Sequence, residues 1–593
     1  MSPDRIRYFR FSSWEGRLKL YGFCTGCVVA SRLSEEEGWK VLLIETGPRD
    51  DAVTRTPRLM PYGLTRSGRQ HTTVEQKKAC RGENSGFCSE ISARILGGGS
   101  SINPMIYARG NRRVFDCWAS AGNPGWSYEE VLPYFKKSED QRNAKYAADK
   151  KYHGTGGYLT VGEPSYFSPM KDLLMEGMSE MGLPEGDLNG EVQYGAMAFQ
   201  GTIGDGRRAS TSRAFLRPAK DRPNLHVITL STVTKLLFDE SGSRAVGVEY
   251  TRGGKTRKVS SSKEVILSVG TYQSPRLLMV SGVGPREELA ELGIPTVKDL
   301  PVGRYLVNHP SVYLKFEMDR RLGIGFENYS TPDSIEAYAK ASGGVLGTST
   351  VEAIALVNSS FADESYPDIQ LIMLSVNPII FAEDDPVWWC IAVATRPQSR
   401  GSLRLASAHE EDEPLIDPRF LEEESDAMVL AEGVDRCLRL ARTRPMRRHH
   451  ARFLFPDYEE CSHLGRDFSP AYLRCLATFY SSSALHPVGT CRMGPANDSQ
   501  AVVDPRLRVY GIQNLRVIDA SVMPEIVNTN TNAATIMIAE KGADMVKDDW
   551  MRQTPAPGDQ GGSADVSRQM DDKRRDQRLN LTRPKQDHQF SSD

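Results

Sequence analysis

The chain has 593 residues, which allows roughly four domains of about 150 residues each or one large two-layered enzyme. Hydrophobic residues make up 39% of it and glycines number 51, so the composition is that of a globular protein and excludes wholesale disorder. Because 74 basic residues stand against 76 acidic ones, for a net charge of −2, we expect no global positive field that recruits nucleic acid or an anionic membrane.

The cysteine content and the N-terminal residues indicate in which cellular compartment the protein is expected. Ten cysteines are too sparse for a disulfide scaffold, so we expect a reduced protein. No apolar run approaches the roughly 18–20 residues that cross a bilayer, and residues 1–22 have no apolar stretch of the signal-peptide type. We therefore expect a soluble chain without a membrane span, cytoplasmic by default. Residues 551–593 contain few apolar side chains and are predicted to form a disordered tail.

The first strand and helix signals lie near the N-terminus. Small and apolar residues at helical spacing predict a helix over 27–33, and an apolar run predicts a strand over 40–44 that ends at Glu45. An acid at the end of the second strand, 19 positions after Gly26, is where a ribose-binding carboxylate lies in a dinucleotide fold. An ordinary βαβ unit with an exposed glutamate explains this passage equally well.

The glycine loop that should precede this helix is altered. Aligning Gly26 as the last glycine of G-x-G-x-x-G puts Tyr21 and Phe23 at the other two glycine positions. Glycine there lets the backbone approach a pyrophosphate, so Phe23 is expected to obstruct a cofactor. The alternating run over 17–21 also differs from the continuous apolar run of a central parallel strand. Our hypothesis is that the first 25 or so residues come from a mistaken or altered start of the coding sequence.

Two later passages repeat the pattern of strand, loop and helix. An apolar strand ends at Gly270, and Ser274-Pro275 predicts an N-cap followed by a proline at the first helical position. A strand beginning at Leu515 delivers Asp519 at its C-terminal end, and an Asn/Thr cluster then opens a helix with Asn530 near its N-terminus. The partial positive charge there favours an anionic ligand or an electron-rich ring, although a simple Asn/Thr cap is the alternative.

Two longer motifs make the pattern specific. One is ARILGGGSSINPMIYARG over 93–110, and the other is the segment over 270–284. With these motifs the chain resembles the glucose–methanol–choline (GMC) family of FAD-dependent oxidoreductases, and in particular its choline-dehydrogenase-like and aryl-alcohol-oxidising members. The resemblance runs from about Gly26 to Met545 in the family's order.

The resemblance implies an α/β fold with two interleaved parts. One is a doubly wound, Rossmann-like FAD-binding domain, expected over 15–160, 205–310 and 476–550. The other is an α+β substrate domain with an antiparallel sheet, expected over 161–204 and 311–475.

The resemblance also implies which residues bind FAD. By position, Gly26 and Glu45 match contacts to the pyrophosphate and ribose, and Val233 matches a backbone contact to adenine. Some relatives bond the flavin to a histidine in the GGxSS turn, but the matching residue here is Ile102, so FAD is expected to be non-covalent. The remaining expected contacts to the cofactor are Gly99, Asn103, Pro104, Ile106, Asp519, Ala520 and Thr531.

The expected chemistry removes a proton and a hydride from one carbinol. His486 matches the family's catalytic base, and an unperturbed imidazole pKa of about 6.5 suits that role. Asn530 matches the second catalytic position, where its amide could orient the substrate oxygen. Two stretches depart from the family pattern: residues 77–90, and Asn308, which replaces a usual aspartate. The other histidines form no metal-ligand pattern, so no metal is expected.

The leading interpretation is an FAD-dependent enzyme that oxidises a CH–OH group to a carbonyl. Its partners are a small-molecule alcohol and either oxygen or another electron acceptor. Two alternatives stay open: a flavin-free relative that acts as a binding or scaffold protein because the glycine loop is broken, and a flavin-dependent cyanohydrin lyase. The sequence does not predict which alcohol reacts, whether the enzyme is an oxidase or a dehydrogenase, or the oligomeric state.

Overall fold

The computed structural model describes residues 17–22, 24–84, 86–319, 322–341, 343–349, 351–363, 365–375, 387–409, 411–455, 460–465 and 467–552. Contacts divide the chain into two units, Met1–Met545 and Val546–Asp593. The sheets described below belong to the first unit. In the second, the structure describes the end of the last helix, α16 (Asn532–Met551). Most of the predicted disordered tail, residues 553–593, lies outside the described residues.

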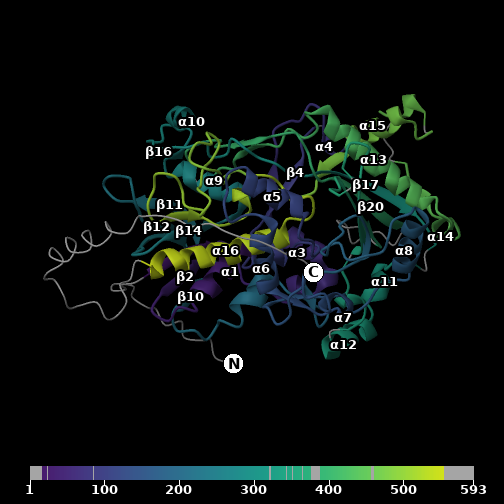
Figure 1. Cartoon of the computed structure of the whole chain (residues 1–593), viewed down its shortest axis with the longest axis horizontal. Helices are drawn as coiled ribbons and strands as arrows, with labels where there is room; N and C mark the ends of the chain where they lie inside the picture. The colour runs from purple at the N-terminus through teal and green to yellow at the C-terminus, as the bar shows by residue number, and fades with distance from the viewer. Residues whose placement is uncertain are drawn as a thin grey trace, which may run out of the picture. The chain divides into compact units, whose positions relative to one another are not determined.

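A five-stranded parallel sheet forms one layer of the first unit (Figure 1). β1 lies at its centre and pairs with β2 on one side and β14 on the other. The alternating sequence of β1 therefore does not keep it from the central position, because the pairing is made by the backbone. The strands, in spatial order, are β10 (Leu225–Ile228), β2 (Lys40–Ile44), β1 (Arg17–Gly22), β14 (Val265–Ser268) and β25 (Leu515–Val517).

The first helix, α1 (Cys24–Leu33), follows β1 and is buried along its length. The predicted helix over 27–33 and the predicted strand over 40–44 are thus confirmed. An ion pair joins α1 to the C-terminal helix, because Arg32 donates from Nε and Nη2 to the two carboxylate oxygens of Glu540 at 2.7 and 2.8 Å. Both helices lie beside the parallel sheet (Figure 1), so two segments that are about 500 residues apart in the sequence lie side by side.

The prediction for the helix after β14 is wrong at its start. α9 (Gly270–Val280) begins five residues earlier than Ser274-Pro275 indicated, and Pro275 lies inside it. Asp519 from the loop after β25 provides the cap instead, because its Oδ2 accepts the backbone N–H of Gly270 at 3.0 Å. Proline cannot bond the carbonyl one turn earlier, and that carbonyl, on Thr271, accepts the hydroxyl of Thr490 at 2.6 Å.

A larger antiparallel sheet forms the second part of the first unit. Its order is β23-β17-β20-β19-β18-β7, and β24 pairs with the first residues of β17. This confirms the expected antiparallel sheet, and with the parallel sheet it confirms the α/β class. Its strands are β7 (Gly195–Ala198), β17 (Pro310–Glu317), β18 (Val351–Val357), β19 (Ile369–Leu374), β20 (Val387–Ala394), β23 (Arg452–Phe453) and β24 (Ser481–Ser483).

Both faces of this sheet are covered. On one face the strands pack against α8 (Met170–Glu180), α13 (Glu424–Ala441) and α15 (Pro470–Phe479) in one apolar cluster. On the other face, side chains such as Ile354 and Ile372 pack against Met105 and Ile106. The second face therefore lies on the segment that follows the GGxSS turn, which brings the sheet to the expected cofactor site.

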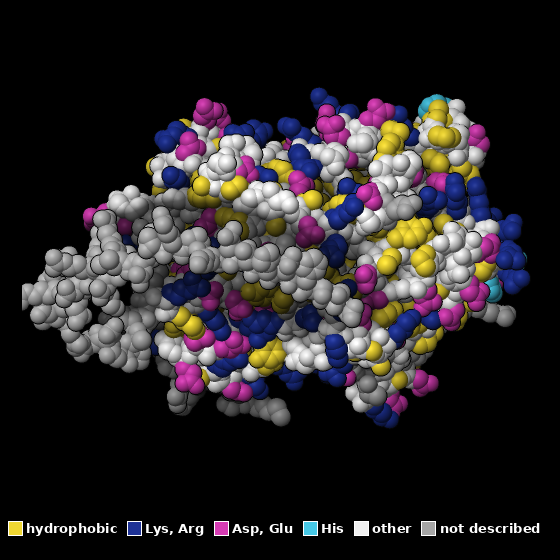
Figure 2. All heavy atoms as spheres, in the orientation of Figure 1, with side chains coloured by type: hydrophobic (Ala, Val, Ile, Leu, Met, Phe, Trp, Pro, Cys, Tyr) yellow, Lys and Arg dark blue, Asp and Glu magenta, His cyan; other side chains and the backbone are white. Residues whose placement is uncertain are grey.

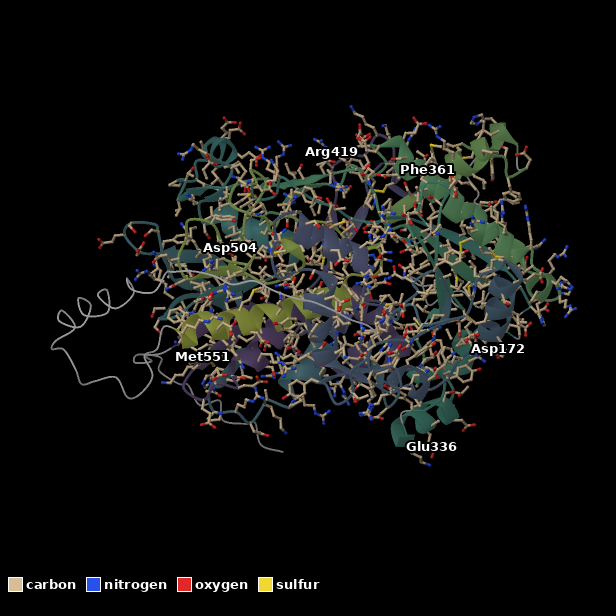
Figure 3. The ribbon with its side chains drawn as sticks, in the orientation of Figure 1. Asp172, Glu336, Phe361, Arg419, Asp504 and Met551 are labelled. Carbon is tan, nitrogen blue, oxygen red and sulfur yellow. A yellow bond between two sulfur atoms is a disulfide. The ribbon has the colours of Figure 1, made fainter. Side chains whose placement is uncertain are left out.

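The remaining elements are a three-stranded sheet, five two-stranded pairs and further helices, and side chains fill the space between the ribbons (Figure 3). The three-stranded sheet is β11 (Thr232–Phe238), β12 (Ala245–Arg252) and β13 (Lys255–Ser260). The two-stranded pairs are β3 (Gly68–Thr72) with β4 (Ser89–Ala93), β5 (Glu139–Gln141) with β6 (Leu159–Val161), β8 (Ile203–Gly204) with β9 (Arg207–Arg208), β15 (Val283–Gly284) with β16 (Lys298–Asp299) and β21 (Ser402–Arg404) with β22 (Leu415–Asp417). The helices are α2 (Ala52–Arg55), α3 (Met60–Ser67), α4 (Arg81–Asn84), α5 (Arg112–Ser120), α6 (Tyr128–Ser138), α7 (Ala144–Ala147), α10 (Arg286–Glu291), α11 (Phe326–Tyr329), α12 (Pro332–Ala341) and α14 (Arg444–Arg447).

The surface carries charges of both signs, as expected from the 74 basic and 76 acidic residues of the sequence. Basic and acidic side chains are interspersed over the face drawn in Figure 2. None of the helices that the structure describes has the length and apolar character needed to cross a bilayer.

Three disulfides contradict the expectation of a reduced chain. Cys80 pairs with Cys88, Cys390 with Cys437 and Cys461 with Cys475, and the Cα atoms of the pairs lie 5.3, 5.8 and 5.8 Å apart. Cysteine density is a poor guide here, because a disulfide needs only two side chains that the fold brings together. Cys390–Cys437 joins β20 to α13 in the core of the antiparallel sheet.

The disulfides predict a simple thiol count. Denatured without reductant, the protein should react with a thiol reagent at four cysteines, because Cys24, Cys27, Cys117 and Cys491 are free. After reduction it should react at all ten. In the folded protein only Cys117 is exposed among the free cysteines. Ten reactive thiols before reduction would show that the disulfides do not form.

Candidate active site

The carboxyl edge of the parallel sheet holds the first group of predicted residues. Glu45 follows β2 and is 1% exposed, so the alternative of an exposed glutamate is wrong. Its Oε1 accepts the backbone N–H of Gly47 at 2.7 Å, whereas its Oε2 is buried without a hydrogen bond. Burial raises the pKa of Glu45 to about 8. A carboxylate oxygen left without a donor in this position is available to the hydroxyls of a bound sugar.

Three more buried polar atoms without a hydrogen bond lie at the same edge. They are Thr25 Oγ1 in the first turn of α1, Ser268 Oγ at the end of β14 and Asn532 Nδ2 at the start of α16. The two helix starts meet, because Cys24 Sγ lies 3.5 Å from Asn532 Oδ1. Ligands of open parallel sheets bind at this edge, and helix N-termini favour anionic groups. The edge therefore fits a polar, anionic cofactor.

Gly26 and Val233, the other residues that the resemblance matches to this end of the cofactor, lie in α1 and β11. Gly26 is buried in α1, and Val233 lies in β11 opposite Tyr250. The turn before β11 contacts Glu45 directly, because Ser231 donates its backbone N–H to the Glu45 carbonyl at 3.0 Å. Phe23, the residue expected to obstruct the cofactor, lies outside the described residues.

The GGxSS turn forms a short 3-10 helix, η2 (Gly98–Ser101). Gly97 adopts φ +91° and Gly98 φ +54°, backbone values that favour glycine. Ser100 donates from its hydroxyl to the Gly97 carbonyl at 2.6 Å. A Cβ placed on Gly99 would meet no atom within 4 Å, so the turn presents an open backbone surface. Ile102 packs in an apolar cluster with Ala93 and Ile95.

The segment after the turn is held by a buried arginine that the sequence did not single out. Arg208 donates from Nη1 to the backbone oxygen of Asn103 at 2.6 Å and to its Oδ1 at 2.8 Å. Arg208 is 1% exposed, its Nη2 has no hydrogen bond, and burial lowers its pKa to about 9. Pro104 accepts the hydroxyl of Ser349 at 3.2 Å, and Ile106 bridges Gly201. These contacts hold the expected flavin-binding segment rigidly.

Asp519 lies at the end of β25, as predicted, but its side chain is fully occupied by the protein. Its Oδ2 accepts the backbone N–H of Gly270 and the hydroxyl of Ser274, and its Oδ1 accepts the N–H and hydroxyl of Ser521. Ala520 opens the 3-10 helix η6 (Ala520–Val522), and Thr531 accepts the N–H of Thr535 at 2.9 Å. The Asp519 carboxylate therefore ties α9 to the C-terminal segment.

The two predicted catalytic residues meet. His486 Nε2 and Asn530 Nδ2 lie 3.1 Å apart. The Asn530 amide is oriented by Gln370 on β19, whose Nε2 donates to Asn530 Oδ1 at 3.0 Å. Since the Asn530 nitrogen is a donor, His486 Nε2 must be the acceptor and carry a lone pair. The pair thus lies between the C-terminal segment and the antiparallel sheet.

A second histidine completes the hydrogen bonding of His486. His309, immediately before β17, places its Nδ1 3.1 Å from Nδ1 of His486. Because Nε2 of His486 is the acceptor, its Nδ1 carries the proton and donates to His309. The sequence showed His309 only as the neighbour of Asn308, and it gave no sign of Gln370, because neither lies near His486 along the chain.

Burial moves the pKa of the predicted base away from its ordinary value. The pKa of His486 falls to about 4, because the charged imidazolium is poorly solvated in this site. The pKa of His309 is also lowered, by burial and by the neighbouring His486. Both rings are therefore neutral near pH 7, which leaves the Nε2 lone pair of His486 free to accept a proton.

No group of three or more His, Cys, Asp or Glu residues with a metal-binding arrangement occurs in the part of the chain that the structure describes.

Comparisons with known proteins match the chain to one family. Two family models, both described as GMC oxidoreductase, match residues 40–311 and 397–539. The chain is 38% identical over 544 residues to a glucose dehydrogenase (FAD, quinone) of Drosophila pseudoobscura pseudoobscura, covering 89% of this chain and 86% of that one. It is 35% identical over 549 residues to the mitochondrial choline dehydrogenase of Homo sapiens, covering 89% and 90%.

The fold is also that of a solved oxidase. Pyridoxine 4-oxidase from Mesorbium loti superposes with a TM-score of 0.77 at 26% identity, covering 91% of this chain and all of that one.

Proposed function

Because the chain belongs to the GMC oxidoreductase family, we propose that it is an FAD-dependent enzyme that oxidises the CH–OH group of an alcohol to a carbonyl. The observation that carries this proposal is the partly buried pair at 3.1 Å, with the lone pair of His486 Nε2 facing the Asn530 amide. Relatives named as glucose and choline dehydrogenases support an alcohol substrate.

The residues at the sheet edge and the GGxSS turn fit FAD. Glu45 would hold the ribose through its unpaired oxygen, Gly26 would approach the pyrophosphate, and Val233 would face adenine. Bound FAD supplies the hydride acceptor. Ile102 packs into an apolar cluster and cannot bond a flavin, so the cofactor is held non-covalently. The residues that would form the flavin side of the site are Gly99, Asn103, Pro104, Ile106, Asp519, Ala520 and Thr531.

The chain's own residues handle the proton. An alcohol that enters between His486 and Asn530 donates its hydroxyl proton to Nε2 and accepts an N–H from the Asn530 amide, replacing their direct contact. Gln370 keeps that amide in the donating orientation. His309 accepts the Nδ1 proton of His486, which keeps the lone pair on the side that faces the substrate.

The two sheets suggest how the chain divides. The strands of the parallel sheet lie within 15–160, 205–310 and 476–550, which we assign to FAD. Most strands of the antiparallel sheet lie within 161–204 and 311–475, which we assign to the substrate. β24, inside the last FAD segment, pairs with β17 and joins the two parts.

Three disulfides favour maturation in an oxidising compartment instead of the cytoplasm. The electron acceptor is oxygen or a quinone-like molecule, since a relative is named for FAD and quinone.

The test is anaerobic mixing of flavin-loaded protein with primary, aromatic and polyol alcohols while the flavin absorbance is recorded. Bleaching by at least one alcohol supports the proposal. Protein that holds no flavin would instead support a binding or scaffold protein. Tightly bound flavin that no alcohol bleaches, together with release of cyanide from a cyanohydrin, would support the lyase.

The pH dependence of kcat/KM follows from the lowered pKa of His486. A base must be neutral to accept a proton, so kcat/KM should be constant above the pKa of His486 and fall as the pH drops through about 4. An imidazole in water would lose activity already near pH 6.5. The measurement is kcat/KM for a reactive alcohol between pH 3.5 and 8, with stability checked at each pH. A decline centred near pH 6.5 would show that the site does not shift this pKa.

A further inference from the structure

Glu90 is a buried carboxylate close to the catalytic pair. It lies on β4 and is 0% exposed. No residue that the structure describes forms an ion pair with it. Burial raises its pKa to about 7, although the nearby polar side chains of Ser483, Tyr272 and Asn308 oppose the shift. Burying a carboxyl group costs free energy unless the protein provides hydrogen bonds to it.

The contact that Glu90 makes is to the amide of Asn308. Asn308 Nδ2 donates to Glu90 Oε1 at 2.9 Å and to Ser483 Oγ at 3.0 Å. Both hydrogens of this amide are therefore used, and the nitrogen can only face Glu90 and Ser483. The amide oxygen consequently points the other way.

That oxygen holds the two histidines. Asn308 Oδ1 accepts the backbone N–H of His486 at 2.9 Å and that of His309 at 2.9 Å. The preceding residue, Leu485, has φ +61°, a conformation that a leucine keeps only when its surroundings hold it. Its N–H is donated to Ser483 Oγ at 3.0 Å. The turn that presents His486 thus depends on the side chains of Asn308 and Ser483.

We propose, on the basis of the function proposed above, that Glu90 is a positioning residue for the catalytic base. Together with Ser483 it orients the Asn308 amide, and that amide fixes the backbone of His486 against Asn530. Glu90 itself touches neither reacting group.

This arrangement explains why two departures from the family pattern occur in one chain. The family resemblance implies an aspartate at position 308, where this chain has asparagine, and the stretch 77–90, which also departs from that pattern, ends at Glu90. An aspartate at 308 would put two carboxylates in contact where Asn308 Nδ2 now lies 2.9 Å from Glu90 Oε1. Two charged carboxylates at that distance repel. The asparagine at position 308 avoids this repulsion, because its amide donates a hydrogen bond to Glu90.

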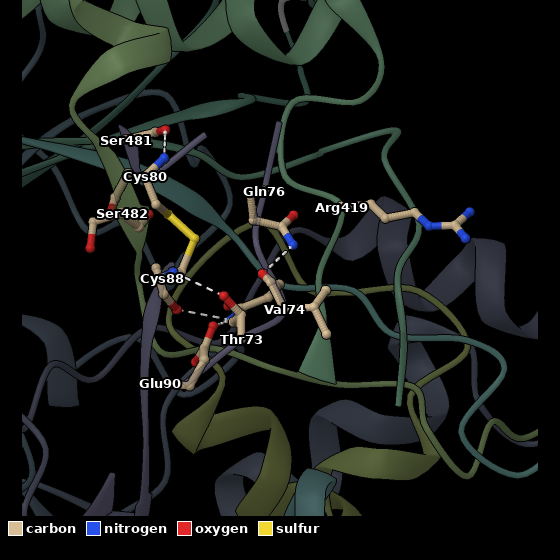
Figure 4. The surroundings of a disulfide bond; sticks show 12 residues. Thr73, Val74, Gln76, Cys80, Cys88, Glu90, Arg419, Ser481 and Ser482 are labelled. Carbon is tan, nitrogen blue, oxygen red and sulfur yellow. Dashed lines mark hydrogen bonds between the residues drawn. A yellow bond between two sulfur atoms is a disulfide. The ribbon is translucent and has the colours of Figure 1, made fainter. Parts of the chain in front are cut away.

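The unusual stretch is also bonded to β24, the strand that precedes this turn (Figure 4). The Cys80–Cys88 disulfide closes the loop two residues before Glu90. Cys80 donates its N–H to Ser481 Oγ at 3.1 Å, and Cys88 donates its N–H to Thr73 Oγ1 at 2.9 Å. Ser481 begins β24, the strand that ends at Ser483 and leads to His486. The loop is therefore bonded to the strand that carries Ser483, and it leads along the chain to Glu90.

The test is a charge exchange between positions 90 and 308 in the flavin-loaded full chain. Asn308→Asp should slow flavin reduction by an alcohol about tenfold or more, because a shift of the base of roughly 1 Å can cost that much. Glu90→Gln should have a smaller effect, since its amide oxygen can still accept from Asn308. The double variant should recover to within about threefold of the wild-type rate, because the amide introduced at position 90 can donate to the carboxylate introduced at position 308.

A control and a second readout separate positioning from general stability. Glu352→Gln removes another carboxylate that is 0% exposed with a pKa of about 7, and it should change the melting temperature but not the reduction rate per bound flavin. Crystal structures should show the bond from His486 N to residue 308 broken in Asn308→Asp and restored in the double variant. The crystal structures test the positioning role even if no tested alcohol is oxidised. The absence of alcohol oxidation would contradict the proposed function but not the positioning role. Wild-type geometry in Asn308→Asp, or a double variant no better than it, would overturn the positioning role.

Discussion

Replacing His486 with alanine should lower the rate of flavin reduction by an alcohol about 10²–10⁴-fold, the usual contribution of a positioned general base. The reason is that Nε2 of His486 is the acceptor in the pair with Asn530. Among the described residues, the other side chain hydrogen-bonded to the Asn530 amide is Gln370, which is not a base. The measurement is anaerobic stopped-flow absorbance of the flavin at saturating alcohol.

The matching controls separate chemistry from folding. His486→Gln keeps a polar side chain of similar length but cannot take up a proton, so it should be nearly as slow as His486→Ala. His450→Ala removes a histidine whose side chain is 83% exposed and should keep the wild-type rate. Both His486 variants should retain flavin. A His486→Ala enzyme that reduces its flavin at the wild-type rate would refute the assignment of the base.

Replacing Asp519 with alanine should give the largest loss of stability among the predicted site residues. Its carboxylate accepts four hydrogen bonds, from Gly270, Ser274 and Ser521. A buried donor left without a partner costs about 1–3 kcal/mol, so the loss should be about 3–6 kcal/mol. The variant should melt several degrees lower and lose flavin, because α9 is no longer tied to η6.

A graded series tests this explanation. Ser274→Ala removes one of the four bonds together with its donor and should cost about 1 kcal/mol. Asp519→Asn keeps the volume but turns one oxygen into a donor that faces other donors, so it should lie between the two. The measurements are thermal unfolding and flavin content of the purified proteins. Equal melting temperatures for Asp519→Ala and the wild type would show that the four bonds do not support the fold.

Local patterns in the sequence were sufficient for elements whose residues are neighbours along the chain. The helix at α1, the strand at β2 and the position of Asp519 after β25 all follow from apolar spacing and from the residues that end each run. The family motifs added His486 and Asn530, and the structure brings these residues within hydrogen-bonding distance. In each case the pattern that predicts the element or the site residue spans only a few neighbouring residues.

The start of α9, the disulfides and the partners of His486 were decided only by the tertiary structure. α9 begins at Gly270 because Asp519, which lies 249 residues away, caps it. Cys390 and Cys437 pair because β20 and α13 pack together. Glu90 reaches Asn308 across 218 residues. Hydrogen bonds and disulfides depend on distance in space, so a sequence determines which groups can form them but leaves their partners to the folded chain.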